Sequence, residues 1–404
     1  MNQEITINGC NVFIRDGKIE KITPFPYVKE PRKRIRKEST AGYLIIDCKG
    51  GYLMPGLVDM HAHFPDKKST IKLNSYLKLN LAAGVTCLRS MRGEEWQLAL
   101  RDSINKGIKN YSPQIYVSAV FPQRDSLLNN DNIQKFVMDS KNKGYDFIKY
   151  LGGINETNIN YLMQSCRQNS FSVAGHAFDK SLDKSINLGF TSVEHYQAMY
   201  FAFINDTTNF KKILEKMKAQ KTAFCPTLSF YYIYAFAFSE NELQSRNGMN
   251  YLSPFVKKLW LKEYNEALNG AKEYFKTEFE SNYLLKNKTQ LKIFNRLLKM
   301  AADAGVLLLL SPDDGIFNVP GFGMYEEMKL YKQAGLSNYQ ILKCATYNAS
   351  KYFGTEKIGG SAEVGKKANL ILLNANPLEN IENIKQIEAV ILNGKFYLQK
   401  DLVK

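Results

Sequence analysis

Apolar and polar positions follow one pattern at the two ends of the chain and another in between. In residues 3–48 and again in 368–398, short apolar runs are separated by turn dipeptides such as Asp16-Gly17, which is typical of strands joined by hairpins. From Gly56 to about residue 355, runs that read as strands alternate with helical stretches, which is typical of a parallel α/β sheet. Because both ends predict strands, we expect them to pair in one small domain.

The central part of the chain predicts a closed barrel. Eight strand–helix units fit between residues 55 and 355, the number that closes a TIM barrel. An open doubly wound sheet is the alternative, but no glycine-rich phosphate fingerprint follows a predicted strand. We therefore predict an α/β fold, a (β/α)8 TIM barrel over 55–355, with a small β-sandwich domain built from 1–54 and 356–404.

One stretch of the predicted barrel interrupts the alternation of strands and helices. Residues 228–300 are first dense in aromatic side chains and then largely helical, longer than one crossover helix requires. Two interpretations stay open, namely a lid over the site and an elaborated barrel helix.

Composition narrows the class of protein. The chain has 404 residues, 45% of them hydrophobic, but no run of 18 apolar residues that would predict a membrane span. Its first twenty residues lack the apolar core of a secretory signal, so we expect a cytoplasmic protein, or a periplasmic one if a signal segment is missing. The six cysteines lack metal-binding spacing, which favours reduced thiols.

The chain is basic, with a formal net charge of +15. Six of its lysines and arginines fall in residues 29–37, a segment that could attract nucleic acid or anionic lipid but that more often is a solvated loop. No zinc-finger, helix-turn-helix or RNA-binding signature accompanies it. We therefore expect a small-molecule substrate, no nucleic-acid partner and no membrane span, and we leave a homo-oligomer open.

All four histidines fall at the carboxyl ends of predicted strands. His61 and His63 end the first barrel strand and share one of its faces with Asp59, because side chains alternate along a strand. His176 ends the fifth strand and His195 the sixth. In a TIM barrel these strand ends lie on one rim, where catalytic groups gather.

Two further side chains belong to the same predicted rim. Lys149 ends the fourth strand and Asp313 the eighth. Taken singly, a lysine there is usually solvated and Asp313-Asp314 could cap a helix. Taken together, four imidazoles and a carboxylate predict a metal site, for which zinc is the best match and manganese, iron, cobalt or nickel stay open. Rim position alone adds candidates for a substrate pocket: Arg89, Tyr150, Tyr196 and the aromatic residues 230–234.

These residues carry a resemblance to a known family. The segment from Met54 to His63 resembles the first-strand motif of the amidohydrolase superfamily of metal-dependent hydrolases, and the likeness extends over nearly the whole chain. Within that superfamily it is most similar to the imidazolonepropionase-like and Xaa-Pro dipeptidase-like branch. The other matching segments are Ile148-Lys149 with Gly152-Gly153, Gly175-His176, Val193-Glu194-His195, Pro312-Asp313, Ala334-Gly335-Leu336-Ser337, Ala345-Thr346, Asn348-Ala349, Gly365-Lys366 and Asn376-Pro377-Leu378.

The resemblance implies a site with one or two divalent metals, most often zinc. In the binuclear form one ion would be bound by His61, His63 and Asp313, and the other by His176 and His195. Lys149, carboxylated by CO2, would bridge them. Hydroxide held by the metals would attack the substrate carbonyl, with Asp313 as general base and then general acid. The implied activity is hydrolysis of a C–N bond in an amide, peptide or cyclic amide, with a dipeptidase among the candidates.

Two other functions stay open at this point. One is a heterocycle deaminase with a mononuclear site and an unmodified Lys149, and the other is a non-catalytic barrel that serves as a scaffold. The chain also departs from the family pattern at Ser311-Pro312-Asp313-Asp314, where a Gly-Thr-Asp type segment is more usual. Asp314 is therefore an alternative to Asp313.

Overall fold

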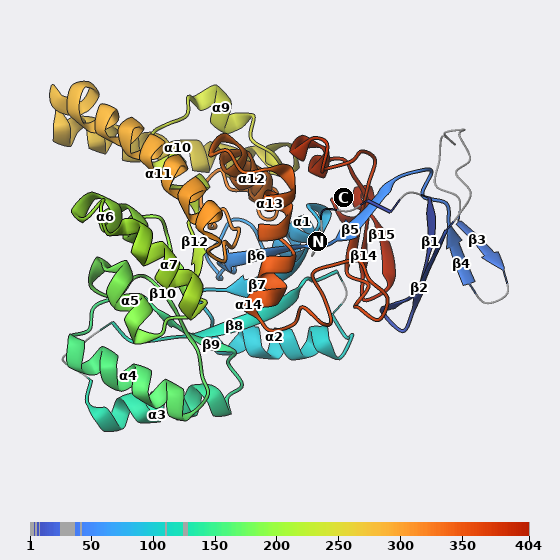
Figure 1. Ribbon diagram of the computed structural model, residues 1–404. Helices are drawn as coiled ribbons and strands as arrows, with labels where there is room; N and C mark the ends of the chain where they lie inside the picture. The colour runs from blue at the N-terminus through green and yellow to red at the C-terminus, as the bar shows by residue number, and fades with distance from the viewer. Residues whose placement is uncertain are drawn as a thin grey trace.

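The computed structural model describes residues 4, 6–7, 9–24, 37–40, 43–109, 111–123 and 128–403. Of the basic segment at residues 29–37, all but residue 37 lies outside these ranges. Within them no helix is both long and apolar enough to cross a membrane. A parallel sheet wrapped by helices makes up most of the molecule, and smaller antiparallel sheets lie at one side of it (Figure 1).

The larger sheet confirms the predicted α/β barrel. In the described residues seven parallel strands pair in sequence order. They are β6 (Leu57–Ala62), β7 (Val85–Ser90), β8 (Gln114–Val120), β9 (Phe147–Tyr150), β10 (Val173–Gly175), β11 (Ser192–Glu194) and β12 (Ala223–Cys225). All six residues of β6 are buried, as expected for a strand covered on both faces.

The predicted eighth strand is present only as a bridging segment. Leu308 forms an isolated parallel bridge with Phe224 of β12, and the amide of Leu309 donates to the carbonyl of Phe224 at 2.9 Å. On the other side, the amide of Met60 in β6 donates to the carbonyl of Leu310 at 3.2 Å. The segment thus lies between the first and last strands of the sheet, although it forms no continuous ladder with either.

Helices follow the strands, as the sequence pattern predicts, and bury one face each. The residues of α4 show the pattern, with Ile159, Leu162 and Cys166 buried on one side. The first seven helices are α1 (Leu73–Ala82), α2 (Glu95–Asn105), α3 (Asn130–Asn142), α4 (Glu156–Gln168), α5 (Leu182–Leu188), α6 (Gln197–Asn205) and α7 (Phe210–Gln220). Three more complete the set beyond the bridging segment: α12 (Gly323–Gln333), α13 (Asn338–Cys344) and α14 (Tyr347–Tyr352).

The stretch after β12 is a helical elaboration of the barrel. It contains α8 (Leu228–Tyr234), α9 (Glu240–Gln244), α10 (Pro254–Phe275) and α11 (Leu285–Ala304). The last two form a hairpin whose tip projects away from the barrel (Figure 1). At its base, Trp260 and Tyr264 of α10 pack against Phe317, with ring centroids 5.9 and 6.0 Å apart. Whether part of this stretch acts as a lid stays a prediction.

The two ends of the chain contribute to one antiparallel sheet. Its order is β15-β14-β13-β5, so that β5 (Tyr52–Pro55) pairs with β13 (Leu370–Leu373) near the far end of the sequence. The other strands are β14 (Ile387–Leu392) and β15 (Lys395–Leu398). The hairpin of β1 (Cys10–Arg15) and β2 (Lys18–Pro24) packs Ile19 against this sheet, and β3 (Lys37–Thr40) pairs with β4 (Tyr43–Ile46). The predicted domain boundaries remain predictions.

Gly56 joins this sheet to the barrel. It separates β5 from β6, and its amide donates to the carbonyl of Asn369 at 2.9 Å. A Cβ at this position would lie 2.3 Å from two side-chain atoms of Thr86, which is too close for any side chain. A residue without a side chain therefore lets the first barrel strand pass directly against β7.

Candidate metal centre

The residues predicted as ligands lie at the carboxyl ends of their strands. They come from five places in the chain, which the barrel brings to one end. His61 is the fifth residue of β6 and His63 follows that strand, Lys149 lies in β9, His176 and His195 directly follow β10 and β11, and Asp313 follows the bridging segment.

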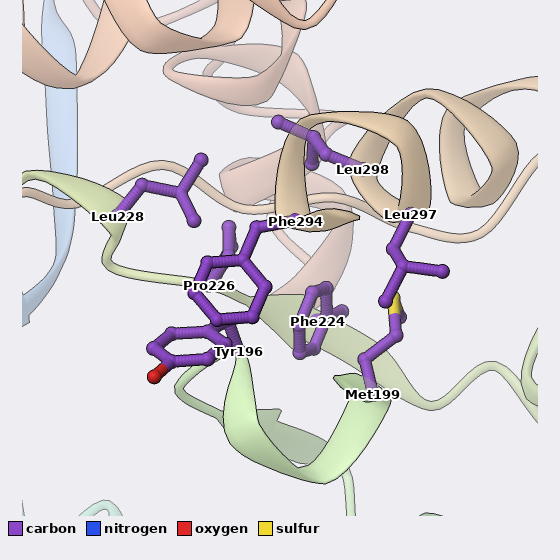
Figure 2. A pocket seen from close by; sticks show the side chains of 8 residues that line it. All are labelled: Tyr196, Met199, Phe224, Pro226, Leu228, Phe294, Leu297 and Leu298. Carbon is purple, nitrogen blue, oxygen red and sulfur yellow. The ribbon is translucent and has the colours of Figure 1, made fainter. Parts of the chain in front are cut away.

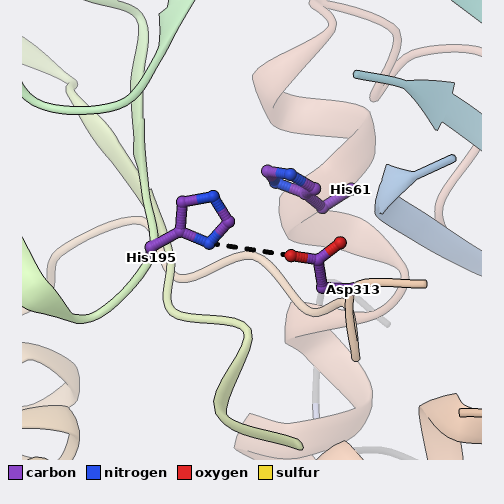
Figure 3. Close-up of side chains that lie close together, drawn as sticks. All are labelled: His61, His195 and Asp313. Atoms are coloured by element: carbon purple, nitrogen blue, oxygen red, sulfur yellow. Dashed lines mark ion pairs between the residues drawn. The ribbon is translucent and has the colours of Figure 1, made fainter. Parts of the chain in front are cut away.

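Three of these side chains converge on one point. The candidate ligand atoms of His61, His195 and Asp313 all lie within 4.8 Å of one another, in an arrangement that could hold a metal ion. Figure 3 shows the two imidazoles and the carboxylate facing one another. The His61 and His195 ring centroids are 4.7 Å apart, and His195 Nδ1 lies 3.8 Å from Asp313 Oδ2.

The other two histidines lie next to this group. His63 Nε2 is 3.1 Å from Asp313 Oδ1, and the His63 ring lies 5.2 Å from that of His61. The His176 ring lies 4.8 Å from that of His195. All four imidazoles are therefore contiguous, with Asp313 between His63 and His195.

Lys149 is buried beside the histidines. Its side chain is only 1% exposed, and its Nζ has no hydrogen-bond partner within the described part of the chain. Burial lowers the pKa of Lys149 to about 8, and the charge of Arg89 also lowers it. An amine left unpaired in the interior is costly, so Lys149 is a candidate to bind a ligand at this site.

Burial also keeps three of the imidazoles neutral. It lowers the pKa of His176 to about 4 and the pKa values of His61 and His195 well below their usual range, and the nearby Lys149 charge acts in the same direction. At neutral pH these rings therefore carry a free nitrogen lone pair. This is the form in which histidine binds a metal.

A buried ion pair supports His61 from inside the barrel. Glu194 Oε2 lies 2.8 Å from His61 Nδ1, and Glu194 Oε1 accepts from Arg89 Nη2 at 2.8 Å. Arg89 also donates through Nε to the carbonyl of Met60 at 2.6 Å. Since Nδ1 of His61 is engaged, its Nε2 is the nitrogen that remains available to a ligand.

The sequence pattern alone does not predict this pair. Arg89 was predicted to line a substrate pocket, which is wrong, because its side chain is fully buried and bonded within the barrel. Glu194 was seen only as part of a motif. The available signal was an acidic and a basic residue, each within an otherwise apolar strand, which a buried strand tolerates only when they pair.

Three neighbouring carboxylates have different partners. Asp59 Oδ1 accepts from the amide of His61 at 3.0 Å and from Ser311 Oγ at 2.5 Å, and burial raises its pKa to about 6. Asp314 Oδ2 accepts from the amide of His63 and from the hydroxyl of Tyr76 at 3.1 Å. Asp313 is the carboxylate that contacts the imidazoles of His63 and His195, which favours it over Asp314 as a ligand.

Two of the clustered residues have unusual backbone conformations. His195 has a φ of 69° and Asp313 a φ of 59°, in the left-handed region that non-glycine residues seldom adopt. Thr227, itself at φ 52°, lies with its Oγ1 2.8 Å from His195 Nδ1. Strain of this kind persists only where surrounding contacts hold it, and it is concentrated at functional sites.

A small apolar pocket is lined by none of the six predicted ligands. It is enclosed by side chains of α6, β12, α8 and α11 (Figure 2). Its lining residues are Tyr196, Met199, Phe224, Pro226, Leu228, Phe294, Leu297 and Leu298. Tyr196, one of the predicted substrate-pocket residues, packs there against Phe294, while Tyr150 packs against Phe178 and Phe190 in the core.

A parallel barrel that gathers imidazoles, an amine and a carboxylate at the carboxyl ends of its strands has the architecture of a TIM-barrel enzyme. Residues 283–397 match the model of the amidohydrolase family. No curated protein matches the chain in sequence.

Solved structures share the fold over nearly the whole chain. Bottromycin amidohydrolase is similar with a TM-score of 0.72 at 20% identity, over 98% of this chain and 84% of that one. A Xaa-Pro dipeptidase with bound methionine has a TM-score of 0.67 at 19% identity, over 96% and 94% of the two chains. Molinate hydrolase has a TM-score of 0.67 at 16% identity, over 98% and 92%. The chain thus shares the fold of these structures along nearly its whole length, and residues 283–397 match the amidohydrolase family model.

Proposed function

We propose that the protein is a metal-dependent hydrolase that cleaves a C–N bond in an amide, a peptide or a cyclic amide. The observation that supports this most strongly is the convergence of His61, His195 and Asp313 within 4.8 Å, with the unpaired amine of Lys149 buried beside them. Nitrogen and oxygen donors in such a cluster suit Zn2+. A dipeptidase is the narrower proposal, prompted by the fold shared with a Xaa-Pro dipeptidase.

The residues present fit a pair of divalent ions. His61, His63 and Asp313 would hold one ion, and His176 and His195 the other. Two buried nitrogens, His63 Nδ1 and Lys149 Nζ, are without a hydrogen-bond partner in the described residues, as expected for atoms that serve a ligand or its shell. When bound, such ions polarise a substrate carbonyl and make a water molecule more acidic.

Lys149 fits the pair best in its carboxylated form. Its amine nitrogen would attack the carbon of CO2 and lose a proton, giving an N-carboxylate with two anionic oxygens. A neutral amine could not bridge two cations, whereas these oxygens could. The alternative, a heterocycle deaminase with a single ion, would leave the Lys149 amine unmodified and unpaired, so the geometry favours the carboxylated form.

Asp313 is placed to move the proton. Its carboxylate is 5% exposed and lies between His63 and His195, at the rim from which a substrate would enter. It would take a proton from the attacking water and deliver it to the leaving nitrogen. The buried imidazoles stay neutral at neutral pH and leave this task to the carboxylate.

The test is a hydrolysis screen of the metal-reconstituted and the chelated protein. The panel holds dipeptides, N-acyl amino acids, lactams and aminated heterocycles, and Asp313→Asn is the inactive reference. We expect turnover of an amide or peptide that is lost on chelation and in the variant. Turnover confined to the aminated heterocycles would support the deaminase instead. A reconstituted protein that retains no metal would support the non-catalytic scaffold.

A further inference from the structure

A buried amide supports the backbone on which Asp313 sits. Asn318, 2% exposed, donates through Nδ2 to the carbonyl oxygens of Pro312 at 3.0 Å and of Asp313 at 2.9 Å. The backbone of Asp313 is left-handed, a conformation that carries a cost for any residue with a side chain. Both peptide groups around the strained position are thus fixed by one side chain from five residues further along.

A buried arginine sets the orientation of that amide. Arg246 Nη2 donates to Asn318 Oδ1 at 2.7 Å, and Ser229 Oγ donates to the same oxygen at 2.7 Å. Because a guanidinium can only donate, Oδ1 of Asn318 must face it, which leaves Nδ2 for the two carbonyls. In the reversed orientation the Asn318 NH2 group would face the Arg246 guanidinium, and the Asn318 oxygen would face the two carbonyl oxygens.

Arg246 comes from the helical elaboration, not from the barrel. It lies just after α9, is 7% exposed, and donates through Nε to the carbonyl of Phe317 at 2.8 Å. Its guanidinium lies 5.2 Å from the ring centroid of Phe238. A buried charge with several bonds is costly to disturb, so it connects the elaboration firmly to the segment that bears Asp313.

We infer that Asn318, oriented by Arg246, is a positioning residue for Asp313. Through these two side chains the helical elaboration determines the direction in which the Asp313 carboxylate points toward His63 and His195. The inference rests on the proposed function, since it takes Asp313 as a metal ligand. It assigns to the stretch after β12 a supporting role that does not require it to move.

The test is a double-mutant cycle on Zn2+ affinity in the full-length chain, measured by competition with a chromophoric chelator. Asn318→Asp keeps the shape and the contact with Arg246 but removes both donated bonds. We expect it to weaken Zn2+ binding roughly 10-fold in the wild-type background. This is the lower end of the loss in affinity expected when a residue that supports a metal ligand is replaced. In the Asp313→Asn background we expect a change below about twofold, because the two residues act as a unit. A purely structural role would give the same loss in both backgrounds.

Asn348→Asp is the matched control. Asn348 is also buried and donates to a barrel carbonyl, that of Leu308 at 2.8 Å, without contacting Asp313, so Zn2+ affinity should stay at the wild-type value. If Asn318→Asp does not fold, Ser229→Ala takes its place in the cycle, because it removes the hydroxyl that donates to the Asn318 amide and accepts from Arg246 Nη2. Wild-type affinity in the variant, or equal losses in both backgrounds, would overturn the inference alone. A wild-type chain that binds no Zn2+ would instead overturn the proposed function.

Discussion

Glu194 Oε2 lies 2.8 Å from His61 Nδ1, deep inside the barrel and shielded from solvent. The contact fixes the ring of His61 and directs its other nitrogen toward His195 and Asp313. Carboxylates in this position orient metal-binding histidines in many proteins and increase the basicity of the ring. Here the carboxylate is itself held by Arg89, so the strands β6, β7 and β11 are joined behind the site.

Replacing Glu194 tests this arrangement. Glu194→Gln keeps the size of the side chain but removes the charge of the carboxylate that accepts a hydrogen bond from His61. We therefore expect Zn2+ affinity to fall roughly 10-fold to 100-fold. The measurement is competition with a chromophoric chelator. Ser192→Ala is the control, because it removes a neighbour of Glu194 and leaves the contact with His61 in place. Unchanged affinity in Glu194→Gln would show that the contact does not orient the ligand.

Arg89 should matter mainly for stability. Arg89→Met fills a similar volume but leaves the Glu194 carboxylate buried without its cationic partner, which costs about 3–5 kcal/mol. Urea denaturation measures the change in the free energy of unfolding. The exposed pair of Arg15 with Glu20, 3.0 Å apart, provides the comparison, and Arg15→Met should cost less than about 1 kcal/mol. Similar costs for the two variants would contradict the assignment of a buried ion pair.

Gly56→Ala tests the junction between the two sheets. The added Cβ would lie 2.3 Å from Thr86, so either the strand or its neighbour must shift, at a cost of about 1–3 kcal/mol. Thermal unfolding measures the loss. Gly50→Ala, in a turn with open space around it, separates the steric effect from the general effect of removing a glycine, although its φ of 74° adds backbone strain. Equal or smaller loss at Gly56 would contradict the close approach.

Glu327 should make stability depend on pH. Its carboxylate accepts from the amides of Leu228 and Ser229 at the start of α8, and burial still raises its pKa from 4.5 to about 8. Between these values the folded chain holds a proton that the unfolded chain releases, so this group's contribution to stability decreases as pH rises from 4.5 through 8. We expect the free energy of unfolding, measured in urea from pH 5 to 9, to fall more steeply in the wild type than in Glu327→Gln. Parallel profiles would contradict this.

The sequence predicted most of the fold because its patterns are local. Apolar runs followed by helical stretches predicted the barrel, which is confirmed. The two chain ends do meet in one sheet, but through β5 (Tyr52–Pro55), which lies beyond the strands expected in residues 3–48. The eighth strand was overpredicted, because Val306–Leu310 is as apolar as a strand but forms only a bridge to β12 and one bond to β6. Apolar composition shows that a segment is buried but not how many ladder bonds it makes.

The candidate site was likewise predicted only in part. All six predicted ligands lie at one end of the barrel, since the carboxyl ends of parallel strands share an edge. Their supporting contacts were not predictable. Glu194 with Arg89 and Thr227 with His195 are pairs between separate segments whose register is set only when the barrel forms. Asn318 reaches back five residues to Asp313, whose left-handed backbone no sequence pattern marks. Whether these six residues bind metal remains a prediction.

The most direct test of the account is a count of metal ions per chain. The protein is reconstituted with zinc and bicarbonate, passed over a desalting column and measured by inductively coupled plasma mass spectrometry. We predict two zinc ions in the wild type and one in Lys149→Ala, with two retained in Lys366→Ala, which removes a buried lysine that bonds Ser361 instead. One ion in the wild type with no change in Lys149→Ala would contradict the bridged pair, and no bound metal at all would contradict the proposed function.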